Sequence, residues 1–174
     1  MMDNNTFSTS SVLTRKAQIT VNVSEEAAFQ FISSSEKLPI WLKKSGPIPG
    51  ADHVELLQEG YAAVGAKRKV YFVGGDSLQE ELRTYNPPGN YSYRVTNIAG
   101  FLGKLSNEAF GQLWFDSEGN GTRITWEYAF TYRSFLTRAV LSLFLTISYR
   151  PFLQKSLKHA KAYLESVTER SNDS

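Results

Sequence analysis

The sequence contains no cysteine among its 174 residues and only two histidines, His53 and His159. The missing thiols exclude disulfides, cysteine nucleophiles and cysteine-based zinc or iron–sulfur sites, and they fit a reducing compartment. A zinc site needs about three or four ligands, and a histidine base must lie beside its nucleophile. We therefore expect a cytoplasmic protein with no metal site and no cofactor.

A strong charge of one sign and a long apolar run are also missing. The 19 Lys and Arg residues against 17 Asp and Glu residues give a net charge of +2, and the basic run "AKRKV" has no interleaved exposed aromatics, so we expect no nucleic-acid partner. The longest uncharged apolar run, "AVLSLFLTISY", has 11 residues between Arg138 and Arg150, whereas a spanning helix needs about 20. The first residues do not have the pattern of a secretory signal.

The spacing of apolar residues predicts an α+β chain. Residues 16–24 alternate apolar and polar side chains, as a half-buried strand does, and Ser24 has the position of an N-cap for the helix that follows. A second short helical or turn segment is expected within 33–50, where prolines interrupt it. Six further strands, separated by turn residues, are predicted over 52–58, 66–73, 77–85, 91–98, 108–116 and 122–132.

A long helical pattern closes the chain, from about Ser134 to Val167. Pro151 is expected to kink or divide this helix because proline lacks an amide donor. The helix has one predicted apolar stripe, and its second half carries Leu153, Leu157, Ala160, Leu164 and Val167. The first half is expected to continue that stripe through Leu136, Val140, Leu143 and Ile147. We expect one domain over residues 15–168, with flexible tails at 1–14 and 169–174.

Three segments carry a resemblance to a known family. They are the opening "AQITVNVSEEAAFQFISSSEKLPIWL", the hairpin "GQLWFDSEGNGTRITWEYAFTY" and the closing "RPFLQKSLKHAKAYLE". Together they resemble the SRPBCC superfamily, and especially its bacterial polyketide cyclase/dehydrase-like branch, over about residues 15–167. The resemblance implies a helix-grip fold, in which a curved seven-stranded antiparallel sheet wraps around a long C-terminal helix and encloses an apolar cavity. Members bind lipids, sterols, hormones, polyketides or quinones, and a minority are enzymes without a shared catalytic motif, so the catalytic residues are unknown.

Strand alternation predicts which side chains line that cavity. The last strand places Trp126 and Tyr128 on one face, and tyrosine hydroxyls can orient a bound ligand. The strand over 108–116 is ambiguous, because Leu113 and Phe115 compete with Phe110 and Trp114 for the inside. The cavity candidates are Arg68, Phe72, Glu80, Leu82, Tyr93, Val95, Trp126, Tyr128, Phe130, Leu141, Phe144 and Leu145. Asp52 and His53 are expected to point to opposite sides of a strand and not to interact.

Three functions stay open at this point. The first is binding, with or without transport, of a hydrophobic or aromatic small molecule or lipid between the sheet and the C-terminal helix. The second is a polyketide cyclase, aromatase or dehydratase, for which Glu80, Tyr93 and Tyr128 are the available acids and bases. The third is a lipid-transfer protein that contacts membranes peripherally through the basic and apolar helix. Leu141, Phe144 and Leu145 would face a ligand, the short helices or the second subunit of a homodimer.

Overall fold

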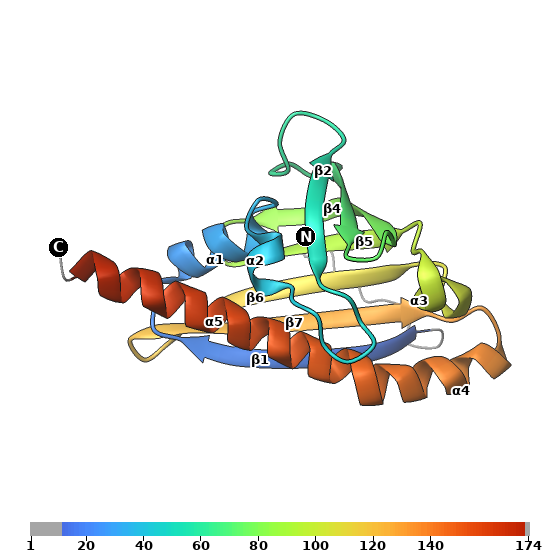
Figure 1. The fold of residues 1–174 in the computed structure, drawn as a ribbon. Helices are drawn as coiled ribbons and strands as arrows, with labels where there is room; N and C mark the ends of the chain where they lie inside the picture. The colour runs from blue at the N-terminus through green and yellow to red at the C-terminus, as the bar shows by residue number, and fades with distance from the viewer. Residues whose placement is uncertain (1–11, 173–174) are drawn as a thin grey trace, which may run out of the picture.

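Seven antiparallel strands form one sheet in the computed structural model, which describes residues 12–172 (Figure 1). The strand order is β1-β7-β6-β5-β4-β3-β2, so the first strand pairs with the last and the other six follow one another as a meander. The strands are β1 (Val12–Val21), β2 (Ala51–Leu56), β3 (Lys67–Phe72), β4 (Ser77–Asn86), β5 (Asn90–Thr96), β6 (Ala109–Glu118) and β7 (Gly121–Thr131). The predicted α+β fold with seven strands is confirmed.

Helices cover one face of this sheet. They are α1 (Glu25–Ser33), α2 (Leu38–Trp41), α3 (Gly100–Leu105), α4 (Phe135–Phe144), the π-helix η1 (Leu145–Tyr149) and α5 (Arg150–Asn172). Helix α5 runs along β1, and α4 lies at the opposite end of the sheet from the C-terminus (Figure 1). Ser24 caps α1 as predicted, because its hydroxyl accepts a hydrogen bond from the Ala27 amide.

The elements extend beyond the predicted domain boundaries. Residues 12–14, expected in a tail, pair with residues 129–131 of β7, and residues 169–172 continue α5. The rest of the two expected tails, 1–11 and 173–174, lies outside the described residues.

The covered face of the sheet is strongly aromatic. Trp126 and Tyr128 are buried on β7, and Tyr93 is buried on β5, as the alternation predicts. The ambiguous strand β6 turns Leu113 and Phe115 inward, while Phe110 and Trp114 are only half-buried on its other face. The short helices reach the same face, since Phe29 of α1 contacts the rings of Tyr91 and Phe115, and Trp41 of α2 contacts Trp126.

The predicted stripe of the long helix is correct in its second half and wrong in its first. Leu153, Leu157, Ala160 and Leu164 are buried, whereas Leu136, Val140, Leu143 and Ile147 of the first half, and Val167 at the end of the second, are exposed. The buried line instead runs through Leu141, Leu145, Tyr149 and Leu153, in steps of four. The predicted line needs a step of six from Ile147 to Leu153, which does not keep two residues on one side of a helix. The wider turn of the π-helix η1 instead keeps residues four apart, such as Leu145 and Tyr149, on the side that faces the sheet. The π-helix η1 ends and α5 begins directly before Pro151, so the helix type changes there, but the backbone stays helical and the helix is not broken.

Helix α3 was not predicted, because glycines interrupt its short sequence, "GFLGKL". It joins β5 to β6 and packs against α4 at the end of the sheet (Figure 1). Among the described residues, no helix combines the length and the apolarity that crossing a bilayer requires.

Candidate functional site

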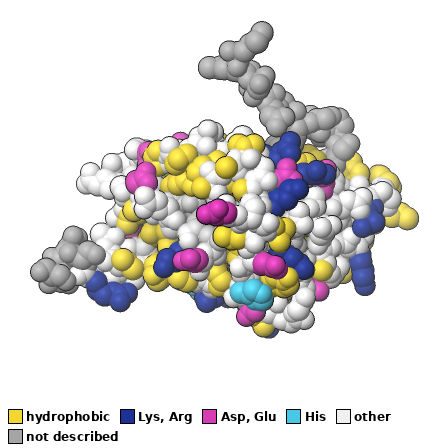
Figure 2. All heavy atoms as spheres, turned by 90° about the horizontal axis from the view of Figure 1, so that it is seen from above, with side chains coloured by type: hydrophobic (Ala, Val, Ile, Leu, Met, Phe, Trp, Pro, Cys, Tyr) yellow, Lys and Arg dark blue, Asp and Glu magenta, His cyan; other side chains and the backbone are white. Residues whose placement is uncertain are grey.

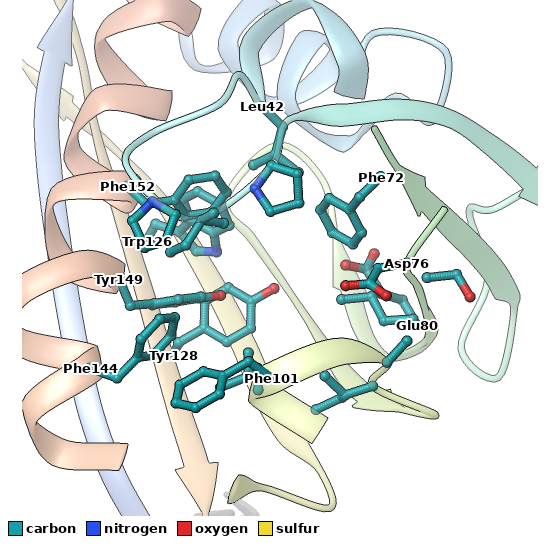
Figure 3. A pocket seen from close by; sticks show the side chains of 18 residues that line it. Leu42, Phe72, Asp76, Glu80, Phe101, Trp126, Tyr128, Phe144, Tyr149 and Phe152 are labelled. Carbon is teal, nitrogen blue, oxygen red and sulfur yellow. The ribbon is translucent and has the colours of Figure 1, made fainter. Parts of the chain in front are cut away.

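A cavity of about 350 Å³ lies between the covered face of the sheet, α3 and the start of α5 (Figure 3). Its walls come from the segment after α2, the β3–β4 hairpin, α3, β7 and the helices α4, η1 and α5. The residues that line it are Leu42, Pro47, Ile48, Pro49, Phe72, Asp76, Ser77, Leu78, Glu80, Ile98, Ala99, Phe101, Leu102, Trp126, Tyr128, Phe144, Tyr149 and Phe152. Most of these side chains are apolar or aromatic, which is the usual composition of a small-molecule site.

A chain of hydrogen bonds orders the aromatic side of the cavity. The Trp126 Nε1–H donates to the Tyr93 hydroxyl over 3.1 Å, and that hydroxyl donates to the Tyr128 hydroxyl over 2.9 Å. Gly111 of β6 lies opposite both tyrosines, and a Cβ atom there would lie 2.3 Å from Cζ of Tyr93. Only glycine therefore leaves the space in which the Tyr93 ring lies over the strand and reaches Tyr128.

The tyrosines of this face remain neutral hydroxyls. Burial raises the pKa of Tyr93, Tyr128 and Tyr149 well above the ordinary value of 10.0. A phenol that keeps its proton can both donate and accept a hydrogen bond. Tyr128 and Tyr149 line the cavity, so they offer a ligand polar contacts without negative charge.

A buried ion pair lies behind the opposite wall. The Arg68 Nε–H donates to Oε2 of Glu80 over 2.7 Å, and the two side chains are only 2% and 7% exposed. The Arg68 guanidinium also donates to the Ser35 hydroxyl and lies 4.2 Å from the centre of the Tyr61 ring. Burial is the largest single influence and would lower the pKa of Arg68, but the Glu80 carboxylate, Tyr61 and Tyr91 together raise that pKa above its ordinary value, so the guanidinium stays charged.

The polar part of the cavity wall carries hydrogen-bond acceptors. The carboxylates of Asp76 and Glu80 lie on one side of the cavity, across from Trp126, Tyr149 and Phe152 (Figure 3). Asp76 is exposed at the hairpin between β3 and β4, whereas Glu80 is buried within β4. No Lys or Arg is among the lining residues of this described cavity, because Arg68 lies behind Glu80. The wall therefore combines an apolar surface with negative charge at one side.

The structure brings five of the twelve predicted site residues to the cavity wall: Phe72, Glu80, Trp126, Tyr128 and Phe144. Two others lie behind the wall and hydrogen-bond to residues that form it: Arg68 donates to Glu80, and Tyr93 donates to Tyr128. The remaining five are buried in the core and do not reach the wall: Leu82, Val95, Phe130, Leu141 and Leu145.

Sequence reasoning missed the part of the wall that comes from loops and from α3. Asp76 in the hairpin and Phe101 in α3 belong to segments without a regular apolar period, so no pattern indicates their position. Tyr149 and Phe152 could have been found, because they follow Leu141 and Leu145 along the buried side of the helix.

The prediction that the side chains of Asp52 and His53 point apart was wrong. A β-bulge between Ala51 and His53 changes the alternation of β2, and His53 Nδ1 lies 2.8 Å from Asp52 Oδ2. Both side chains are exposed, and the His53 ring stacks on Tyr71 away from the cavity. Within residues 12–172, no three His, Asp or Glu side chains gather as a metal ion would require. The absence of a metal or cofactor in the functional protein stays a prediction.

Comparison with known proteins gives matches in family and in fold. A model of the family described as polyketide cyclase / dehydrase and lipid transport matches residues 13–165. Among solved structures, TTHA0849 from Thermus thermophilus has a TM-score of 0.68 at 13% identity, and covers 89% of this chain and 99% of its own. Ginseng major latex-like protein 151 from Panax ginseng has a TM-score of 0.67 at 13% identity, and the match covers 88% of this chain and 98% of the ginseng protein. A protein from Bacillus thuringiensis has a TM-score of 0.63 at 20% identity, and the match covers 87% of this chain and 98% of the Bacillus protein. At identities this low, the TM-scores show a shared fold and nothing further. No curated protein matches the sequence.

Proposed function

Because this chain belongs to the polyketide cyclase/dehydrase and lipid transport family of the SRPBCC superfamily, we propose that it binds a hydrophobic or aromatic small molecule or lipid in the cavity between the sheet and the C-terminal helices. The observation that carries the proposal is the cavity itself, about 350 Å³ with mostly apolar walls. Apolar ligand surface that leaves water in such a site contributes roughly 25 cal/mol per Å² before association costs.

The polar wall supports a narrower ligand class. A ligand that places a carboxylate beside Asp76 would bring like charges together, which disfavours binding, whereas the charge of Glu80 is balanced by Arg68. A hydroxyl or amine instead donates to these carboxylates, and the Tyr128 and Tyr149 hydroxyls add neutral partners. We therefore expect an apolar or aromatic body that carries a hydrogen-bond donor and no acidic group.

Fluorescence titration tests both parts of this proposal. N-phenyl-1-naphthylamine is a neutral aromatic probe with one N–H donor, and we expect its emission to rise on saturable binding. Dodecanol and dodecylamine should displace it at lower concentrations than laurate, which has the same apolar chain length and a carboxylate. Equal displacement by laurate would contradict the ligand class, and failure of the probe and all three competitors to bind would contradict the cavity function.

A cavity-filling variant locates the binding. Leu78 lines the cavity from β4, so Leu78→Trp replaces cavity space with an indole ring and should weaken probe binding by about tenfold or more. Val64→Trp is the matched control, because Val64 is exposed in the β2–β3 connection and is not part of the wall. Equal probe affinity of both variants would place the probe elsewhere.

The enzyme hypothesis receives less support from this geometry. A general acid or base must reach the proton that it transfers, and the two predicted candidates in β4 and β5 already have partners. Glu80 accepts from Arg68, and Tyr93 donates to Tyr128. The third candidate, Tyr128, lines the cavity but holds its proton tightly, because burial raises its pKa. Binding remains our proposal, and the expected cytoplasmic location stays a prediction.

A further inference from the structure

Apolar side chains gather on the exposed side of α4 and η1. Six of the eleven large apolar side chains that are exposed in the described chain lie here or on the adjacent α3, although these elements are short. With their exposed fractions they are Phe101 (54%), Phe135 (80%), Leu136 (79%), Val140 (49%), Leu143 (62%) and Ile147 (64%). We call these six residues the α3–α4 face. An exposed apolar patch of this kind marks an interaction surface.

Helical spacing gives the part of this face on α4 and η1 a single direction. Leu136, Val140, Leu143 and Ile147 follow one another in steps of four, three and four, so they lie along one side of the helix. The opposite side carries Leu141 and Leu145, which are fully buried. The helix therefore has two apolar sides, and the core explains only one of them.

The charges on α4 and η1 beside the α3–α4 face are basic, whereas the exposed carboxylate of Asp76 lies beside Gly100 at the start of α3. Arg133, Arg138 and Arg150 are exposed at or near the ends of α4 and η1, and Lys104 is exposed on α3. The sequence has no acidic residue between Glu127 and Glu165. In Figure 2, hydrophobic side chains lie at the end of the molecule that α4 occupies, with basic side chains beside them. An apolar helix side with flanking arginines is complementary to an anionic lipid surface.

The α3–α4 face is continuous with the cavity. Phe101 is exposed and also lines the cavity, and its ring lies 5.4 Å from the ring of Phe144, which lines the cavity from α4 (Figure 3). The two rings are in edge-to-face contact, so a molecule that passes from the apolar interior of a membrane into the cavity at this point must part them, and its path stays apolar. A second copy of the chain fits less well, because a two-fold contact brings the same arginines toward one another.

We propose that the α3–α4 face docks the protein on an anionic lipid surface, with the side of the cavity that Phe101 and Phe144 form turned toward the bilayer. The proposal rests on the proposed function for the identity of the cargo, but the docking step does not need a filled cavity. The bound state inserts the apolar side of α4 at the level of the lipid headgroups, and the arginines contact the phosphates.

Co-sedimentation with vesicles tests the docking. We expect binding to vesicles of equal parts phosphatidylcholine and phosphatidylglycerol, and weaker binding at high salt or to phosphatidylcholine alone. Leu136→Ser/Leu143→Ser should weaken binding by about tenfold or more, since both side chains lose their burial in lipid. Arg138→Gln should weaken it by about fivefold. The control Leu57→Ser/Val64→Ser removes two exposed apolar side chains from the β2–β3 connection and should bind like the unmodified protein.

Three results of these experiments would overturn the docking proposal. Wild-type protein that stays in the supernatant refutes it, and so does equal vesicle binding by the α4 variant and its control. Self-association that disappears in Leu136→Ser/Leu143→Ser would assign the face to a homodimer instead. Titration of the same variant with N-phenyl-1-naphthylamine in vesicle-free solution separates the two proposals, because the cavity should bind the probe normally even where docking is lost.

Discussion

The ion pair of Arg68 and Glu80 is buried, so breaking it by removing one partner should have a large effect on stability. Arg68→Met removes the charge that lies 2.7 Å from Oε2 of Glu80 and leaves a carboxylate that is 7% exposed without its cation. Breaking a buried pair in this way costs about 3–5 kcal/mol, whereas replacing both partners with apolar residues is often neutral. The loss of the Ser35 hydrogen bond adds about 1 kcal/mol. Because a domain is stable by about 5–15 kcal/mol, Arg68→Met removes a large part of the total.

Urea unfolding followed by circular dichroism measures this effect as a double-mutant cycle. We expect Arg68→Met and Glu80→Leu each to lower the free energy of unfolding, and Arg68→Met/Glu80→Leu to recover most of the loss. A cost below about 1 kcal/mol for Arg68→Met, or additive costs in the double variant, would refute the reasoning about the pair.

Two further predictions concern the aromatic face. Gly111→Ala places a methyl group where the Tyr93 ring lies, so it should lower the free energy of unfolding by about 1–3 kcal/mol and change the near-ultraviolet circular dichroism. In the control Gly89→Ala the new Cβ meets only an ordinary contact at 3.7 Å, so that spectrum should stay unchanged. Unchanged spectra for both variants would contradict the packing of Tyr93 on Gly111. Alkaline unfolding should begin above pH 10, because the pKa of Tyr91, Tyr93, Tyr128 and Tyr149 is raised in the folded state from the ordinary 10.0. The contribution of these neutral tyrosines to stability is fully present below pH 10 and falls by roughly 1 kcal/mol per tyrosine up to about pH 11. Phenolate absorbance should therefore appear together with unfolding. Phenolate from these residues in a protein that is still folded would contradict the raised pKa values.

The sheet could be predicted from the sequence because a strand has a simple period. Alternation alone places Trp126, Tyr128 and Tyr93 on the covered face, and glycine-containing or proline-containing turns separate the strands. The bulge at Asp52 breaks that period, so the contact between His53 and Asp52 was not predicted.

The helix and the cavity wall depend on information that the pattern does not contain. An apolar residue on α4 can face the core, as Leu141 does, or the surface, as Leu143 does, and only the register through the π-turn η1 decides between them. The wall residues Asp76 and Phe101 come from segments whose positions depend on tertiary packing. Sequence therefore predicted the scaffold and four of the seven aromatic side chains of the wall, but not the part of the wall that comes from loops and from α3.

The most direct test of a binding function for the cavity is isotope-filtered NMR of the labelled protein with unlabelled N-phenyl-1-naphthylamine. We predict intermolecular nuclear Overhauser effects from the ligand to Trp126, Tyr128, Tyr149 and Phe152, which line the cavity together. Contacts only to Leu136 and Leu143 on the exposed side of α4, or no intermolecular contacts at saturating ligand, would contradict that function.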